Sequence, residues 1–181
     1  VSVASKGVEK RMAQIRQPAI IGVLGQGGMG AGVSADLRNS GFEVITALEG
    51  RSARTRERAE KAGVRVLASL AEVVAKADTF LSIVPADQAV PLAEAVAKAL
   101  PARTSNQPLH YADCNSITPS KTARIADTIA KAGAVYSDGG IIGPPPGGKM
   151  KTRLYVSGPS SDILTALQSD RMPVIRLGDS I

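Results

Sequence analysis

The sequence contains a single cysteine, Cys114, and a single histidine, His110, and this scarcity excludes several kinds of chemistry. One cysteine cannot form a disulfide within the chain or a thiolate zinc cluster. One histidine argues against multi-histidine metal sites and against Ser-His-Asp triads. A nucleophilic pair of Cys114 and His110 would lack an orienting partner, so we interpret both as residues buried at a strand. We therefore expect no metal site.

Aromatic residues are also scarce, at 3% of the chain with no tryptophan. A nucleic-acid binder would have little stacking surface, although the net charge of +6 suits an anionic partner. A phosphate-rich cofactor accounts for the charge more economically, so we expect no nucleic-acid partner. No apolar run approaches the ~20 residues of a membrane-spanning helix, and we expect no membrane partner either.

The first eighteen residues lack an apolar block of the secretory type. We interpret residues 1–18 as a flexible, solvated N-terminal extension of a cytoplasmic protein. Two alternatives stay open. Four basic residues against Glu9 alone would also suit a mitochondrial transit peptide, and Met12 could be the natural start because residue 1 is a valine.

What the sequence does have is a repeated alternation of apolar runs and helix-patterned segments. This alternation predicts parallel βαβ units, and hence an α/β Rossmann-type, doubly wound and mostly parallel sheet over residues 19–181. Strands are expected at 19–24, 43–48, 64–67, 79–84, 109–113, 134–137, 153–157 and 172–177. Helices are expected at 29–39, 52–62, 69–77, 87–100, 118–132 and 160–168. Residues 139–151, rich in glycine and proline, are expected to form a functional loop.

The first expected strand runs into a G-x-G-x-x-G motif that opens the first expected helix. Gly25 permits a tight turn, Gly27 lets the backbone approach a pyrophosphate, and Gly30 allows close packing of helix on strand. The amino end of the helix offers N–H groups and a partial positive charge to phosphates. We predict a dinucleotide site made by Gly25, Gln26, Gly27, Gly28, Met29 and Gly30.

The residues after the second expected strand bear on the choice of dinucleotide. Glu49 is placed to bind a ribose 2′-hydroxyl, which would favour NAD. Arg51 and Ser52 follow, and a guanidinium beside a hydroxyl suits the 2′-phosphate of NADP. We expect NADP rather than NAD, bound by Arg51 and Ser52, with Arg56 and Arg58 on a solvated helix face.

The sequence has three further signals in residues 25–30 (GQGGMG), 113–119 (DCNSITP) and 138–143 (DGGIIG). Together they resemble the β-hydroxyacid dehydrogenases, which include 3-hydroxyisobutyrate dehydrogenase, 6-phosphogluconate dehydrogenase and the imine reductases. Residues 25–30 have the family's G-x-G-x-M-G form, 113–119 are similar to D-x-S-T-x-x-P, and 138–143 are similar to D-A-P-V-S-G. The resemblance implies an NADP-dependent oxidoreductase that transfers a hydride to or from a hydroxy acid or a related small molecule. It places Asn115 and Ser116 near the substrate. It also places Val84 and Pro85 in a loop that contacts the cofactor.

Two departures from the family pattern concern the substrate. The chain has Asn115 and Ser116 where the family has serine and threonine. It also has Ile142 where the family has a serine that contacts substrate. An apolar residue there favours a bulkier or less polar group than a small carboxylate.

The resemblance further implies a catalytic lysine after the last strand, and then an all-helical domain that closes the site and forms a homodimer. We expect both to lie beyond Ile181, so that this chain is the cofactor-binding portion and is catalytically incomplete alone. The alternative is a non-catalytic dinucleotide-binding module or a truncated fragment. A short-chain dehydrogenase is excluded because no tyrosine begins a Tyr-x-x-x-Lys pair.

Overall fold

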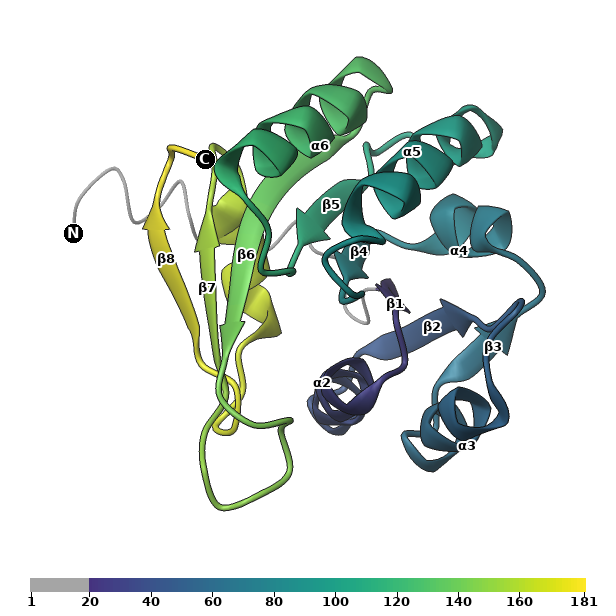
Figure 1. The fold of residues 1–181 in the computed structure, drawn as a ribbon, viewed down its shortest axis with the longest axis vertical. Coiled ribbons are helices and arrows are strands. Elements are labelled where there is room, and N and C mark those ends of the chain that lie inside the picture. Colours follow the sequence, from purple (N-terminus) through teal and green to yellow (C-terminus); the bar gives the residue numbers. More distant parts are fainter. Residues whose placement is uncertain (1–19) are drawn as a thin grey trace.

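The computed structural model describes residues 20–181, so the expectation for residues 1–18 lies outside the described residues. An eight-stranded sheet in the order β3-β2-β1-β4-β5-β6-β7-β8 runs through the molecule (Figure 1). Its strands are β1 (Ile20–Leu24), β2 (Glu43–Ala47), β3 (Arg65–Leu67), β4 (Thr79–Ser82), β5 (His110–Asp113), β6 (Val135–Ile142), β7 (Arg153–Ser157) and β8 (Val174–Gly178). All neighbours pair in parallel except β6 and β7, which are antiparallel. The doubly wound, mostly parallel prediction is confirmed.

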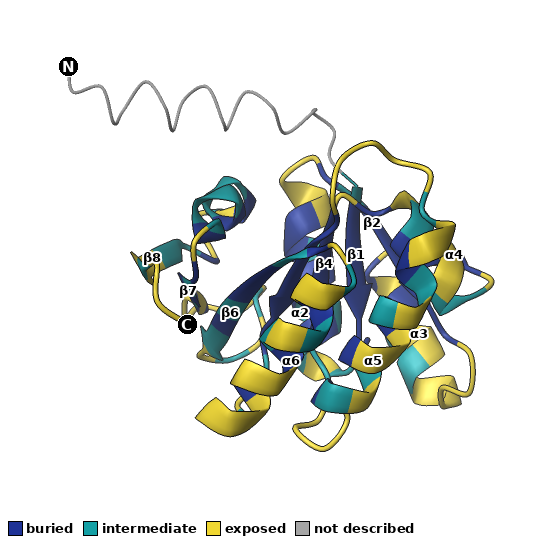
Figure 2. Ribbon diagram, turned by 90° about the horizontal axis from the view of Figure 1, so that it is seen from above, coloured by how far each residue is buried: buried dark blue, intermediate teal, exposed yellow. Residues whose placement is uncertain are grey.

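Helices cover both faces of the sheet. They are α2 (Gly28–Asn39), α3 (Ala53–Lys61), α4 (Leu70–Lys76), α5 (Ala89–Ala99) and α6 (Pro119–Lys131), with 3-10 helices η1 (Leu100–Ala102) and η2 (Ser161–Leu167). α4, α5 and α6 lie on one face, whereas α2, α3 and η2 lie on the other (Figure 1). The central strands β1, β2, β4 and β5 are buried between these layers, and the helices expose their outer sides (Figure 2). Among residues 20–181, no helix has both the length and the apolar character needed to cross a bilayer.

Each face of the sheet has its own apolar core. Under α4, α5 and α6, Phe80, Tyr111 and Tyr136 stack across β4, β5 and β6, with ring centroids 5.3 and 6.3 Å apart. Most of the few aromatic rings of the chain therefore lie together, and their stacking adds to the stabilisation that burial provides. On the other face, Leu37 of α2 and Leu164 of η2 belong to a second core.

Strand β6 is longer than the sequence predicts. It continues through Gly139 and Gly140 to Ile142, into the stretch expected to be a loop, and pairs with β7 from Asp138↔Ser157 to Ile142↔Arg153. The β-branched Ile141 and Ile142 favour an extended backbone, and the antiparallel partner satisfies the glycine peptide groups. The segment 160–168, expected as an α-helix, is the 3-10 helix η2.

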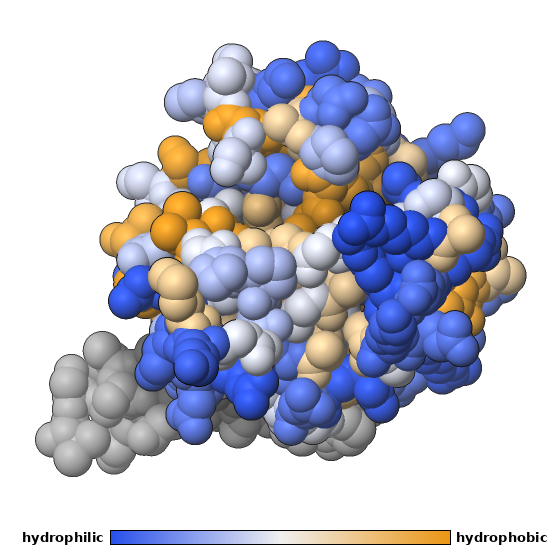
Figure 3. Space-filling view, turned by 60° about the horizontal axis from the view of Figure 1, so that its bottom comes forward, coloured by the Kyte–Doolittle hydropathy of each residue, from blue (hydrophilic) through white to orange (hydrophobic). Residues whose placement is uncertain are grey.

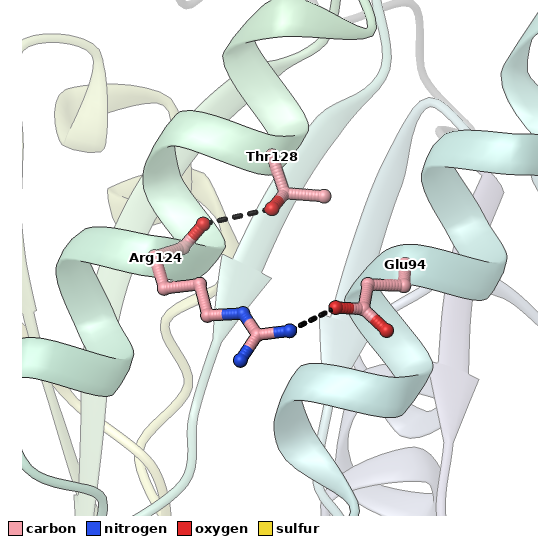
Figure 4. A network of polar contacts seen from close by, with 3 residues as sticks. All are labelled: Glu94, Arg124 and Thr128. Carbon is pink, nitrogen blue, oxygen red and sulfur yellow. Dashed lines mark hydrogen bonds and ion pairs between the residues drawn. The ribbon is translucent and has the colours of Figure 1, made fainter.

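An exposed ion pair joins α5 and α6 (Figure 4). Arg124 Nη2 lies 2.6 Å from Glu94 Oε1, and Thr128 Oγ1 donates to the Arg124 carbonyl at 2.8 Å. Exposed pairs of this kind contribute roughly 0–1 kcal/mol. The two helices are therefore held mainly by the core beneath them, which also fixes the loops at the carboxyl ends of β4 and β5.

Candidate functional site

The turn between β1 and α2 has no room for a side chain at Gly25 or at Gly30. Gly25 has φ +102°, and a Cβ there would lie 2.0 Å from the Ile83 carbonyl oxygen. A Cβ on Gly30 would lie 1.9 Å from the Gly25 carbonyl oxygen. Both contacts are with backbone, which cannot move aside as a side chain can. The turn thus presses β1 and the start of α2 against the end of β4.

Gly27 and Gly28 face open space. A Cβ added at either would meet nothing within 4 Å. Gly27 is the N-cap of α2 without a side-chain cap, and the first turn of α2 contains no acidic residue. The first N–H groups of the helix therefore point toward a space that an anion can enter, with no carboxylate to oppose it. This cradle fits the diphosphate of a dinucleotide.

Gln26 supports the turn from within. Its side chain is buried, and Nε2 donates to the Val23 carbonyl at 3.1 Å and to Ser34 Oγ at 3.0 Å. Any contact of Gln26 with a cofactor must therefore come from its backbone. Met29 is partly buried and packs against the core beneath α2. Of the six residues predicted in this motif, Gly27 and Gly28 are the ones that face open space.

Arg51 and Ser52 lie between β2 and α3 and are exposed. Ser52 caps α3, because its Oγ accepts the Thr55 N–H at 3.3 Å. Arg56, expected on a solvated face, has one contact that the sequence did not reveal: Nη2 donates to the Leu48 carbonyl at 2.8 Å. The side of the molecule carrying α3 is strongly hydrophilic (Figure 3). This hydrophilic side adjoins the carboxyl ends of β1 and β2, where the loops leading to α2 and α3 begin.

The structure brings Asn115, after β5, against Val84, after β4. Val84 N–H donates to Asn115 Oδ1 at 2.7 Å, and Asn115 Nδ2 donates to Ser82 Oγ at 2.9 Å. Pro85 follows directly in the same loop. A predicted substrate residue and the predicted cofactor loop are thus physically linked.

A cavity of about 240 Å³ opens beside the carboxyl end of β5 and residues 138–140 of β6. Its lining includes Asn115, Ser116, Asp138, Gly140 and Tyr155. Polar residues at the carboxyl ends of parallel strands form the usual ligand crevice of this fold. The sequence analysis did not predict Asp138 or Tyr155 as site residues. Asp138 could have been predicted, because it is the first residue of the third segment that resembles the family. Tyr155 could not, because it is brought to the cavity only by the antiparallel pairing of β6 with β7.

Asp113 and Asp138 face each other in the β5–β6 register. Asp113 is fully buried, and this burial raises its pKa to about 6, aided by the negative charge of Asp138 and opposed by the Asn115 N–H at 3.0 Å. Burial also raises the pKa of Asp138. Neighbouring carboxylates in a low-dielectric place disfavour double ionisation. Asp138, which lines the cavity, and Asp113, which is buried beside it, thus protonate more readily than usual.

Cys114 and His110 are buried at β5, as the sequence interpretation held. His110 Nε2 lies 2.8 Å from Ser137 Oγ, and burial lowers its pKa to about 4. Burial raises the pKa of the Cys114 thiol. Ser137 is itself fully buried, so this histidine–serine contact has no access to a substrate. Within residues 20–181, no three histidine, cysteine or acidic residues gather in a way that could hold a metal ion.

Solved structures with this fold include dehydrogenases and reductases. A conserved protein of unknown function, described as similar to 3-hydroxyacid dehydrogenases, is 25% identical with TM-score 0.76, over 89% of this chain and 58% of that one. The 3-hydroxyisobutyrate dehydrogenase of Mycobacterium tuberculosis, solved with L-serine, is 22% identical with TM-score 0.71, over 90% and 55%. An imine reductase variant from Myxococcus stipitatus with NAD+ is 18% identical with TM-score 0.72, over 90% and 55%. The chain spans little more than half of these proteins.

The sequence comparison is more specific than the shared fold. No curated protein matches the chain. A family model for the NAD binding domain of 6-phosphogluconate dehydrogenase matches residues 20–168, which include the glycine turn, the β4 loop and both strand ends of the cavity. The chain therefore belongs to the family of the NAD-binding domain of 6-phosphogluconate dehydrogenase, as its resemblance to the β-hydroxyacid dehydrogenases implied.

Proposed function

We propose that this chain is the cofactor-binding portion of an NADP-dependent oxidoreductase acting on a hydroxy acid or a related small molecule. One observation carries the proposal: the amino end of α2 is open above Gly27 and Gly28, while Gly25 and Gly30 beside them have no room for a Cβ. That opening leaves the first N–H groups of α2 accessible to a diphosphate. When bound, the nicotinamide ring supplies or accepts a hydride.

The proposed dinucleotide lies across the carboxyl edge of the sheet. The backbone of residues 25–30 binds the diphosphate at the amino end of α2. Arg51 and Ser52 bind the 2′-phosphate at the end of β2, where the guanidinium offers paired donors and charge. Val84 and Pro85 contact the nicotinamide half, because the crevice between β1 and β4 is where the strand order reverses.

The substrate is proposed to enter the cavity beside β5 and β6. Ser116 is exposed at its rim and offers a hydroxyl for a hydrogen bond. Asn115 also lines the cavity. Ile142, at the end of β6 and two residues beyond Gly140, is 57% exposed and offers an apolar side chain outside the cavity. The arrangement suits a small molecule with one polar end and an apolar remainder.

The preference for NADP is tested by calorimetric titration of the chain with NADPH and NADH. NADPH should bind at least tenfold more tightly, and Arg51→Ala should remove most of that difference while leaving NADH affinity within about twofold, since one charge-assisted contact is worth roughly 1.5–3 kcal/mol. Lys61→Ala is the matched control: it removes one positive charge at the far end of α3. Tighter binding of NADH by the wild-type chain would refute the assignment of NADP.

A further inference from the structure

The side chain of Asn115 joins the two strand ends on which the proposed nicotinamide site depends. Its Oδ1 accepts the backbone N–H of Val84 at 2.7 Å. Its Nδ2 donates to Ser82 Oγ at 2.9 Å. Ser82 is fully buried. The amide group is therefore engaged with the protein, on the end of β4 and on the loop that follows it.

Asn115 is itself held in place by buried groups. Its backbone N–H donates to Asp113 Oδ1 at 3.0 Å, and Asp113 has no exposed surface. Just before it, the Cys114 N–H donates to the Ser82 carbonyl at 3.0 Å. These bonds fix the start of the loop after β5 against the end of β4. A side chain anchored in this way can determine where its partner, Val84, lies.

Val84 in turn touches the glycine turn. A Cβ on Gly25 would lie 3.1 Å from Val84 Cγ1 and 2.0 Å from the Ile83 carbonyl oxygen. Ile83 N–H donates to the Leu24 carbonyl at 2.9 Å. A shift of Val84 would therefore alter the crevice between β1 and β4. Displacements of about 1 Å in positioning groups are enough to impair a bound reactant.

We propose that Asn115 is a positioning residue that holds the Val84–Pro85 loop where the nicotinamide half of the dinucleotide binds. The inference rests on the proposed function and adds a role beyond substrate contact. It also explains a departure from the family pattern, which has serine at this position. A serine hydroxyl is too short to reach both Val84 N–H and Ser82 Oγ, whereas an asparagine amide offers an acceptor and a donor side by side.

The test separates the two halves of the cofactor. The wild-type chain and Asn115→Ala are titrated calorimetrically with NADPH and with 2′-phospho-ADP-ribose, which lacks the nicotinamide. We expect Asn115→Ala to weaken NADPH binding at least fivefold and 2′-phospho-ADP-ribose binding less than twofold. The blue shift of NADPH fluorescence on binding should also diminish. Asn115→Ser, which keeps a small polar side chain, carries the same expectation if the alanine variant does not fold.

The other possible outcomes would contradict either the positioning role of Asn115 or the proposed function. Equal weakening of both ligands would overturn the positioning role, because a general loss of structure affects both halves alike. Unchanged NADPH affinity would overturn it as well, and so would equal affinity of the wild-type chain for the two ligands. Failure of the wild-type chain to bind NADPH, NADH or 2′-phospho-ADP-ribose would instead overturn the proposed function. Ser120→Ala, which removes an exposed hydroxyl on α6, controls for unspecific effects.

Discussion

At the scale of single residues, His110 makes folding depend on pH. It is buried, and its pKa falls from the ordinary 6.5 to about 4 because burial disfavours the imidazolium, with the charge of Asp162 acting the other way. Between these two values the unfolded chain binds a proton that the folded chain rejects. The folded state therefore loses stability as pH falls from about 6.5 toward 4.

His110→Gln keeps a hydrogen-bonding group near Ser137 but cannot titrate. The free energy of unfolding is measured with urea at pH 7 and at pH 5. Between these pH values the variant should lose roughly 1–2 kcal/mol less than the wild-type chain. The absolute stability of the variant is irrelevant, because only the difference between the two pH values is compared. A difference identical to that of the wild-type chain would contradict the buried, neutral state of His110.

Asp113 has the opposite effect. Its pKa is raised from 3.8 to about 6 by burial, so the folded chain takes up a proton between these values that the unfolded chain does not bind. Its contribution to stability is therefore lowest at neutral pH and improves as pH falls from 6 toward 4. Asp113→Asn retains an acceptor for the Asn115 N–H and should raise the unfolding free energy at pH 7.5 by roughly 1–2 kcal/mol.

Urea unfolding at pH 7.5 and at pH 4 checks this prediction. The gain from Asp113→Asn should shrink toward zero at pH 4, where the wild-type carboxyl is already protonated. His110→Gln and Asp113→Asn thus serve as controls for each other, since they change the pH slope in opposite directions. A gain that is equal at both pH values would indicate that the carboxyl is ionised in the folded chain throughout.

At the scale of elements, the amino end of α2 provides a substitution that separates binding from folding. Gly27→Ala adds a methyl group that meets no protein atom within 4 Å, at a backbone conformation (φ −71°, ψ −165°) open to alanine. The melting temperature should stay within about 2 °C, which corresponds to less than ~1 kcal/mol for a chain of this length. NADPH affinity should fall at least tenfold, because the methyl group occupies the space of the diphosphate.

The control for Gly27→Ala is Gly148→Ala, which also adds a methyl group in open space but lies in the loop after β6. It should change neither stability nor affinity. Full NADPH affinity in Gly27→Ala would place the diphosphate elsewhere. A large loss of stability would show that Gly27 serves the turn rather than the ligand.

Most elements could be predicted from the sequence because their signals are local. The apolar run of β1, the glycine motif and the start of α6 at Pro119 depend on neighbouring residues alone. The extension of β6 through Gly139 and Gly140 was missed, because glycines signal a turn unless an antiparallel partner is known. The link of Asn115 to Val84, 31 residues apart, depends on a side-chain conformation that no pattern encodes.

At the scale of the whole molecule, the last three strands are tied back to the first helix. Ser169 Oγ, between η2 and β8, lies 2.5 Å from Asp36 Oδ2 of α2. The loop between β6 and β7 also reaches α2: a Cβ on Gly32 would lie 2.9 Å from Pro145 Cβ and 3.1 Å from Pro146 Cδ. Helix α2, whose amino end is the proposed diphosphate site, therefore also supports the loop between β6 and β7.

Gly32→Ala sets two effects of similar size against each other. Alanine favours the helix over glycine by about 1 kcal/mol, whereas its methyl group must displace the proline rings of the loop. Because the loop is exposed and α2 is packed on the core, the loop should yield and the melting temperature should stay level or rise slightly. Trypsin should then cleave after Lys149 and Lys151 several times faster than in the wild-type chain, as mass spectrometry of timed digests would show. Unchanged cleavage together with a lower melting temperature would mean that the helix, not the loop, moves.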